Sequence, residues 1–156
     1  MTTGHVFATL PAKIINRTAD LTGATPVYVA LLSNLWTPNA ALSVFADLTG
    51  EPVGAGYTAG GMVLDGLAPA GVPGGTGLKR AGNLTWPGLS VVFRYAVAYL
   101  GGPGALGQHL VCWWDFITDQ NPAGVNTNLV PDATGFFALA SADVGTAPPA
   151  GSTGAG

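Results

Sequence analysis

Charged side chains are scarce in this sequence. Of its 156 residues, five are Lys or Arg and eight are Asp or Glu, which is 8% of the chain, whereas ordinary soluble domains carry about 25%. A folded chain of this size exposes roughly 7,000 Å² of surface, or one charge per ~500 Å². Either the surface is unusually uncharged or part of it faces other protein. Because 48% of the residues are hydrophobic, we favour the second interpretation.

Cations are too few to form a nucleic-acid-binding face. The formal net charge is −3, and Lys79 and Arg80 are the only adjacent cations, so no surface neutralises a row of phosphates. Residues 71–80 are as glycine-rich as a phosphate-binding loop, but Leu78 stands where that motif requires Lys. We expect no nucleic acid partner.

Cysteine and long apolar runs are also lacking. The single cysteine, Cys112, has no disulfide partner and is typical of a small buried apolar residue, which fits a reducing compartment or a fold without disulfides. Arg94 interrupts the apolar run 89–100, so no transmembrane helix is expected and we predict no membrane partner. The first residues lack the basic and apolar regions of a signal peptide.

Residue patterns that perform catalysis or hold metals are missing. His5 and His109 are the only histidines, and no serine lies in a nucleophile elbow. The spacings of metal-binding loops are absent from the sequence. We therefore predict a protein that is not an enzyme, with no cofactor and no metal.

What the sequence does contain is glycine, proline and alternating apolar segments. It has 24 glycines and 12 prolines, which favour turns and short strands over long helices. Residues 89–99 and 109–117 each alternate with a period of two and are rich in β-branched and aromatic residues. Gly and Pro fill the segment between them, so we predict an antiparallel pair joined by a loop.

The segments in order predict a mainly β fold. Between residues 26 and 141 we expect about seven strands in a single antiparallel β-sandwich or barrel-like domain. Residues 1–25 would be an N-terminal arm with a short helix or loop from Pro11, and residues 142–156 a flexible Gly/Ala/Pro-rich tail. Further expectations are strands at 26–33, 62–68, 125–130 and 136–140, a helical turn in 42–48, and a long loop at 69–82.

Two groups of residues are candidates for the core and for contact with other protein. Large apolar residues on the alternating faces should form the core: Phe93, Tyr95, Val97, Leu110, Cys112, Trp114, Phe116 and Phe136. Apolar residues of the arm and the loops are candidates for an interface: Val6, Phe7, Leu10, Trp36 and Tyr57.

One cluster in the second apolar segment has two interpretations. Asp115 follows Trp113 and Trp114, and aromatic rings beside a carboxylate are typical of a carbohydrate-binding surface. Alternatively, Asp115 forms an ion pair with Arg94 across the hairpin, and the two tryptophans belong to the core or to a subunit contact.

Several stretches resemble small structural proteins of tailed bacteriophages. The resemblance rests on PVYVALLSNLWTPN (26–39), GAGYTAGGMVLDG (54–66), LTWPGLSVVFRYAVAY (84–99), LVCWWDF (110–116) and PDATGFFALA (131–140). It covers residues 26–141 and contains no catalytic signature. Members of that family are β-rich virion components, so the resemblance implies a virion protein and transfers no catalytic residue.

The composition agrees with this kind of protein and leads to a functional hypothesis. We expect a capsid decoration, or minor capsid, protein on the outer surface of the head, made in the bacterial cytoplasm. Its partners would be the major capsid protein and further copies of itself, with a trimer as the first choice of symmetry. A tail or neck protein of the same virion is an alternative, and a carbohydrate-binding module is another.

Overall fold

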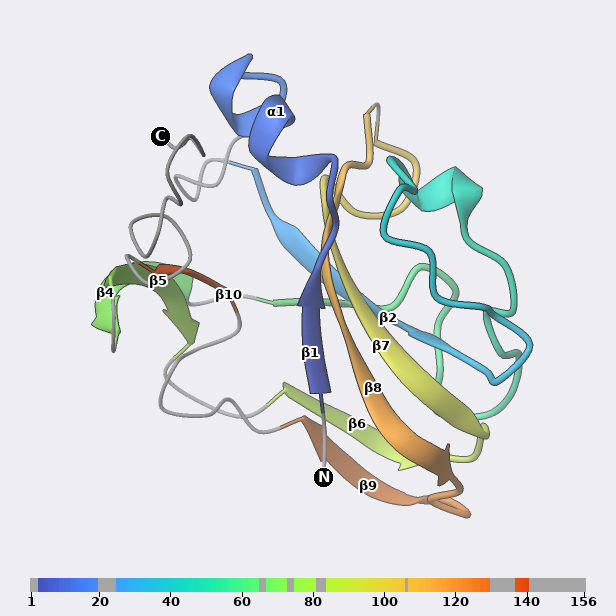
Figure 1. Ribbon diagram of the computed structural model, residues 1–156. Helices are drawn as coiled ribbons and strands as arrows, with labels where there is room; N and C mark the ends of the chain where they lie inside the picture. The colour runs from blue at the N-terminus through green and yellow to red at the C-terminus, as the bar shows by residue number, and fades with distance from the viewer. Residues whose placement is uncertain are drawn as a thin grey trace. The chain divides into compact units, whose positions relative to one another are not determined.

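The computed structural model describes residues 3–19, 25–64, 67–72, 75–80, 84–105, 107–129 and 137–140. They form ten strands, one α-helix and one 3₁₀ turn, η1 (Figure 1). The chain divides into two compact units. The first comprises residues 1–65 and 84–128, and the second comprises residues 66–83 and 129–156. The domain predicted for residues 26–141 therefore spans parts of both units.

A five-stranded antiparallel sheet organises the first unit. Its order is β1 (Thr3–Val6), β8 (Leu110–Gln120), β7 (Phe93–Leu100), β2 (Val27–Leu32) and β3 (Met62–Val63). β1, β8, β7 and β2 run side by side in Figure 1. The predicted hairpin is confirmed, since β7 pairs antiparallel with β8 at the centre of the sheet.

The pairing of β7 with β8 is irregular in two places, and both irregularities redirect side chains. Ala98 lies opposite Cys112 and Tyr99 lies opposite Leu110, so Val111 is an extra residue in β8. A bulge of this kind reverses the alternation of faces beyond it. Leu110 and Trp113 consequently join the same buried cluster, although strict alternation had assigned them to opposite faces.

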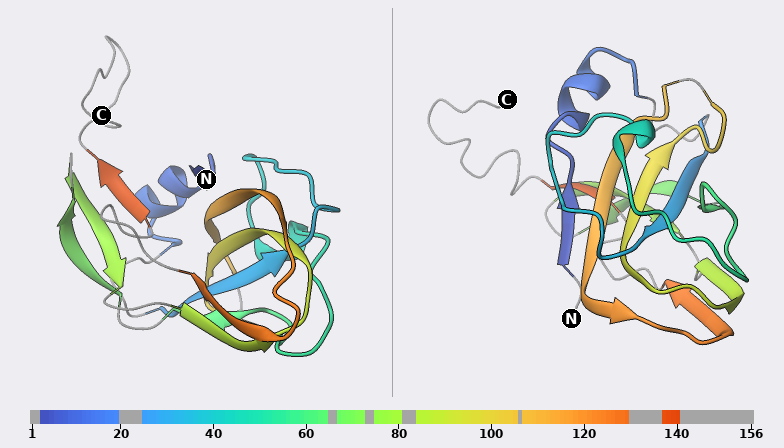
Figure 2. Two further views of the ribbon diagram at one scale, coloured as in Figure 1. Left: turned by 90° about the horizontal axis from the view of Figure 1, so that it is seen from below. Right: turned by 90° about the vertical axis from the view of Figure 1, so that its right-hand side faces the viewer.

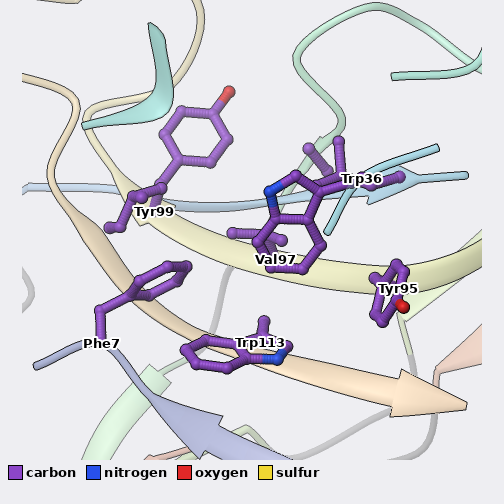
Figure 3. Close-up of a cluster of buried hydrophobic side chains, with 9 residues drawn as sticks. Phe7, Trp36, Tyr95, Val97, Tyr99 and Trp113 are labelled. Atoms are coloured by element: carbon purple, nitrogen blue, oxygen red, sulfur yellow. The ribbon is translucent and has the colours of Figure 1, made fainter. Parts of the chain in front are cut away.

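That cluster forms the aromatic core on one face of the sheet (Figure 3). Trp36 lies 5.0 Å from Tyr95 and 6.0 Å from Trp113, both edge-on, and Phe7 lies 4.6 Å from Trp113. Phe45 stacks on Tyr99 at 4.2 Å. Such ring pairs add roughly 0.5–1.5 kcal/mol each beyond the burial of area, so this cluster is a major source of stability in the first unit.

Most predicted core residues are buried. Phe93, Tyr95, Val97, Leu110 and Cys112 are at most 5% exposed. The prediction is wrong for Trp114 and Phe116, which are half-buried: the bulge at Val111 directs Trp113 rather than Trp114 into the core. Phe116 instead packs edge-on against Phe93 at 5.6 Å. Phe136 lies outside the described residues.

A second sheet of the first unit pairs β6 (Leu84–Leu89) with β9 (Val125–Leu129). β6 buries Leu84, Trp86 and Leu89. Both strands lie at the end of the sheet where β7 begins and β8 ends, as Figures 1 and 2 show. Short bends connect β6 to β7 and β8 to β9, so the chain turns a corner between the sheets. The first unit thus has seven strands in two antiparallel sheets, one of them β1 from the predicted arm, and the predicted mainly β fold is confirmed.

The second unit contains a three-stranded antiparallel sheet in the order β10 (Phe137–Ala140), β5 (Gly75–Arg80) and β4 (Leu67–Val72). The long loop predicted for residues 69–82 was wrong, because β4 and β5 form a hairpin there. Side-chain periodicity is weak in this Gly/Pro-rich segment, and backbone pairing rather than a hydrophobic pattern defines its strands.

The predicted arm is part of the first unit from residue 3 onward. Residues 3–6 form β1, which pairs with β8, and α1 (Leu10–Ile15) follows with Pro11 in its first turn. The helical turn predicted within residues 42–48 is confirmed as η1 (Phe45–Asp47). The Asp47 carboxylate accepts hydrogen bonds from the Ser43 and Val44 N–H groups, both at 3.1 Å, and so fixes the start of that turn.

Candidate interaction surface

The predicted interface residues are mostly inside the protein. Phe7 and Leu10 are fully buried and Trp36 is 3% exposed, so their prediction as contact residues is corrected. Pairing of β1 with β8 brings Phe7 against Trp113. The apolar surface of Phe7 is therefore buried within the same chain and not by a partner protein.

The other two predicted interface residues differ in their surroundings. Val6 is 44% exposed and stays available for contact. Tyr57 is half-buried, and its hydroxyl donates to Glu51 Oε1 at 2.6 Å while accepting from the Leu31 N–H at 3.0 Å. Burial and the hydrogen bond to Glu51 raise the pKa of Tyr57, which keeps the donating proton in place. Tyr57 therefore holds a loop against β2.

Four of the eight exposed large aliphatic side chains among the described residues come from segments at one end of the five-stranded sheet. We call them the apolar end: Leu35, Val53, Val92 and Ile117, which are 80%, 97%, 44% and 46% exposed. Leu35 follows β2, Val92 precedes β7 and Ile117 lies in the second half of β8, and strand register places these three positions at the same end of the sheet. Val53 lies in the loop between η1 and β3. Surfaces that keep such residues in water commonly serve protein–protein contact.

Hydrogen bonds connect the segments that carry the apolar end. Asn34 Nδ2 donates to Asp119 Oδ2 at 2.8 Å, which ties the loop after β2 to the end of β8. The Ser33 N–H donates to the Gly50 carbonyl at 2.8 Å, and the Ser90 N–H donates to the Ala55 carbonyl at 2.9 Å. The loop that bears Val53 is thus held at both sides, so these side chains are presented from a fixed framework.

Ile117 has a strained backbone. Its φ is +71°, in the left-handed region that β-branched residues rarely adopt, at a cost of roughly 1–3 kcal/mol. The residue lies in the second irregularity of the β7–β8 pairing, where Phe93 pairs with Gln120 and Tyr95 with Asp115. Bulges that carry such strain often redirect a side chain for a function. Here the outcome is an exposed isoleucine.

An ion pair holds this bulge in position. Arg94 Nε donates to Asp115 Oδ1 at 3.1 Å and Nη2 donates to Oδ2 at 3.4 Å, so the guanidinium grips both oxygens. Asp115 Oδ1 also accepts from the Ile117 N–H at 2.7 Å. The hydrogen bond from Arg94 lowers the pKa of Asp115, so the carboxylate stays charged through the neutral range. The predicted Arg94–Asp115 pair is confirmed.

The carbohydrate site suggested by Trp113, Trp114 and Asp115 does not assemble. Trp113 is 6% exposed and belongs to the core. Adjacent residues of a strand project to opposite faces, so the two indoles cannot form one stacking platform. Asp115 is engaged by Arg94.

The remaining chemistry-bearing groups give no other site in the part of the chain that the structure describes. No group of three or more His, Cys, Asp and Glu side chains there could hold a metal ion. Burial raises the pKa of the Cys112 thiol, which disfavours the reactive thiolate. None of the described helices has both the length and the apolar character needed to cross a membrane.

Comparison with known proteins identified no similar protein. No protein-family model, no curated protein and no solved structure matches the chain. The candidate surface is therefore argued from its own residues.

Sequence reasoning missed all four residues of the apolar end. A signal was present at two of them, because Leu35 and Val53 are large apolar residues within turn-forming segments, Asn34 to Asn39 and Pro52 to Gly54. Loops run over the surface, so large apolar residues in them are candidates for exposure, although Trp36 in the first of these segments is buried. Ile117 gave no such signal, since it continues an alternating strand pattern.

Proposed function

We propose that this protein is a structural component of a bacteriophage virion that binds the major capsid protein as a decoration protein on the outside of the head. The observation that carries the proposal is the apolar end: four exposed aliphatic side chains on a fixed framework, one of them held in a strained conformation. Backbone strain at Ile117 costs stability, and it places an apolar side chain in solvent. Such an arrangement is typical of a surface that binds another protein.

Composition and resemblance support the same function. Thirteen charged residues in 156 leave few ions to desolvate when copies pack against a shell. The net charge of −3 suits the outside of a DNA-filled shell better than its inner wall. Two of the stretches that resemble small phage structural proteins, residues 26–39 and 84–99, contain Leu35 and Val92 of the apolar end.

The test uses substitutions within the folded domain. Deletion of the first twelve residues would remove β1 together with the buried Phe7 and Leu10, so failure to bind would only report unfolding. We instead choose Leu35→Lys with Val53→Lys, because both side chains are almost fully in water. The matched control is Ile15→Lys on α1, which is 78% exposed.

Purified protein is mixed with capsids that lack it, and occupancy is measured by sedimentation. We expect the double variant to lose at least about tenfold in apparent affinity, because two charges would be desolvated in an apolar contact, and we expect Ile15→Lys to bind like the parent. Full occupancy by the double variant would contradict the proposed surface. Absence of binding by the parent protein would contradict the decoration function.

A tail or neck position in the same virion is the second candidate, since the same apolar end would serve there. Copy number separates the two positions: hundreds of copies per particle indicate decoration, and a few to tens indicate a neck or tail site. Quantitative gel analysis of purified virions makes that measurement.

A further inference from the structure

The five-stranded sheet ends at β1 on one side and at the two-residue strand β3 on the other. The outer edge of β1 carries backbone groups that pair with no described residue. β1 pairs with β8 on one side, and no described strand pairs with its other side. Gly4, His5 and Val6 are exposed. An edge with unpaired N–H and C=O groups is a template on which a further strand can add.

The hydrogen-bonding pattern identifies which groups face outward. The Phe7 N–H donates to the Val111 carbonyl at 3.1 Å, so residues in step with Phe7, such as His5, direct their backbone groups to β8. Gly4 and Val6 direct theirs to the open side. The next residue in step with them, Ala8, is already used, because its N–H donates to the Ala40 carbonyl at 2.9 Å. The free edge therefore consists of two N–H and two C=O groups.

We propose that this edge pairs with the same edge of a second copy, as an antiparallel two-fold contact centred on His5. In that register Gly4 lies opposite Val6 of the partner and Val6 lies opposite Gly4 of the partner. Each outward N–H then meets an outward C=O, which gives four backbone hydrogen bonds. Two copies of the five-stranded sheet become one continuous sheet.

Charge and side-chain chemistry favour a second copy as the occupant. A two-fold contact places residues against their own copies, so a charged edge would repel itself. β1 has the sequence TGHV and carries no acidic, Lys or Arg side chain. The free edges of natural sheets are commonly protected by lysine or proline, and this edge has neither.

The central residue adds an aromatic contact. The His5 ring stacks on Trp113 with centroids 4.9 Å apart and an interplanar angle of 21°. Residues in a non-hydrogen-bonded pair lie about 4.5 Å apart at Cα, so the two His5 rings would lie side by side. They would extend the stack into a row of four rings across the contact.

The contact is small, so we expect a weak dimer. Interfaces that bury less than about 1,200 Å² are typical of transient association. A lattice that holds copies close together would raise the effective concentration and favour the pairing. The proposal does not depend on attachment to a capsid, because it concerns the protein alone in solution.

The experiment measures mass against concentration for the purified full chain by sedimentation equilibrium. We expect a monomer–dimer equilibrium. Val6→Pro removes one outward N–H per copy without touching a bond to β8, and we expect it to weaken dimerisation at least about tenfold. Val6→Lys places a charge at the contact and should act likewise. The control is Val63→Lys on β3, at the opposite edge, which should dimerise like the parent.

Three results would overturn the proposal. One is a parent protein that stays monomeric at millimolar concentration. The same result would be obtained if the edge paired only with a strand of a different protein, and it would overturn the proposal in that case too. Another is the trimer that was the first choice of symmetry from the sequence alone, because a two-fold contact cannot produce a trimer. The third is a dimer that Val6→Pro leaves unchanged while circular dichroism shows that the variant is folded.

Discussion

The outer edge of β1 and the outer side of β2 differ in what covers their backbone groups. On the outer side of β2, the Leu31 N–H donates to the Tyr57 hydroxyl and the Ser33 N–H to the Gly50 carbonyl, while β3 pairs antiparallel with β2. One segment, residues 50–64, thus covers this side of β2, which we call the closed edge. At the β1 edge, the groups of Gly4 and Val6 pair with no described residue.

The closed edge cannot pair with a strand of another molecule, whereas the β1 edge can. The closed edge depends on glycines with positive φ, on the half-buried Tyr57 and on Glu51, which accepts from both the Tyr57 hydroxyl and the Gly60 N–H. No comparable device covers β1 among the described residues. Substitutions at the closed edge should therefore destabilise the monomer, whereas substitutions at the open edge should affect only association.

The largest effect is expected at Gly61 in the closed edge. Its φ is +81°, and a Cβ there would lie 1.9 Å from the Val29 carbonyl oxygen. Gly61→Ala should lower the free energy of unfolding by about 3 kcal/mol or more, because backbone must move. Gly104→Ala is the control, since φ there is +77° with open space around it, and it should cost only about 1 kcal/mol. Urea unfolding checks both, and equal losses would show that the fit against β2 is unimportant.

The next effect concerns the Tyr57 hydroxyl. Tyr57→Phe leaves the Leu31 N–H and Glu51 without this partner, so we expect a loss of about 1–3 kcal/mol and faster hydrogen exchange at Leu31. Tyr28→Phe is the control, since the Tyr28 hydroxyl makes no hydrogen bond to another described residue. If the Leu31 amide stays equally protected in Tyr57→Phe, the loop does not close the edge through this group.

A smaller effect is expected from Asp115, on the strand that pairs with β1. The folded protein lowers the pKa of Asp115 from about 3.9 in the unfolded chain, so its charge contributes stability above that value. The contribution is lost as the pH falls through the folded pKa. Asp115→Asn should thus cost less than about 1 kcal/mol at pH 7, because solvent screens the pair.

The dependence on pH distinguishes this ion pair from a general change in charge. Stability of the parent and of Asp115→Asn, measured by thermal unfolding from pH 2 to 7, should converge below about pH 3. A constant difference at every pH would argue against the role assigned to Asp115.

The smallest effect on the monomer is expected at Val6. Val6→Lys alters an exposed side chain on the open edge and should change the free energy of unfolding by less than about 0.5 kcal/mol, while weakening association as proposed above. A loss of stability comparable to that of Tyr57→Phe would mean that the open edge is also part of the monomer's stability, and the contrast between the edges would disappear.

Much of the fold was accessible from the sequence because it follows from local rules. Alternation over residues 89–99 and 109–117 predicted the hairpin, and Phe45 and Leu48 predicted a helical turn. The pair of Arg94 with Asp115 followed from their facing positions. The interface residues could not be identified in this way, since the apolar character of Phe7 and Trp36 fits a core as well as a contact.

By itself, the sequence determined that the protein is mainly β, poor in charge and organised around one aromatic hairpin, because period, propensity and composition act locally. Only the tertiary structure decided which faces are buried. The extra residue Val111 reverses the alternation and exchanges Trp114 for Trp113 in the core. Pairing of β1 with β8 brings Phe7 inside and leaves Val6 at a free edge. Register and strand partners depend on contacts between residues far apart in the chain, which no local pattern contains.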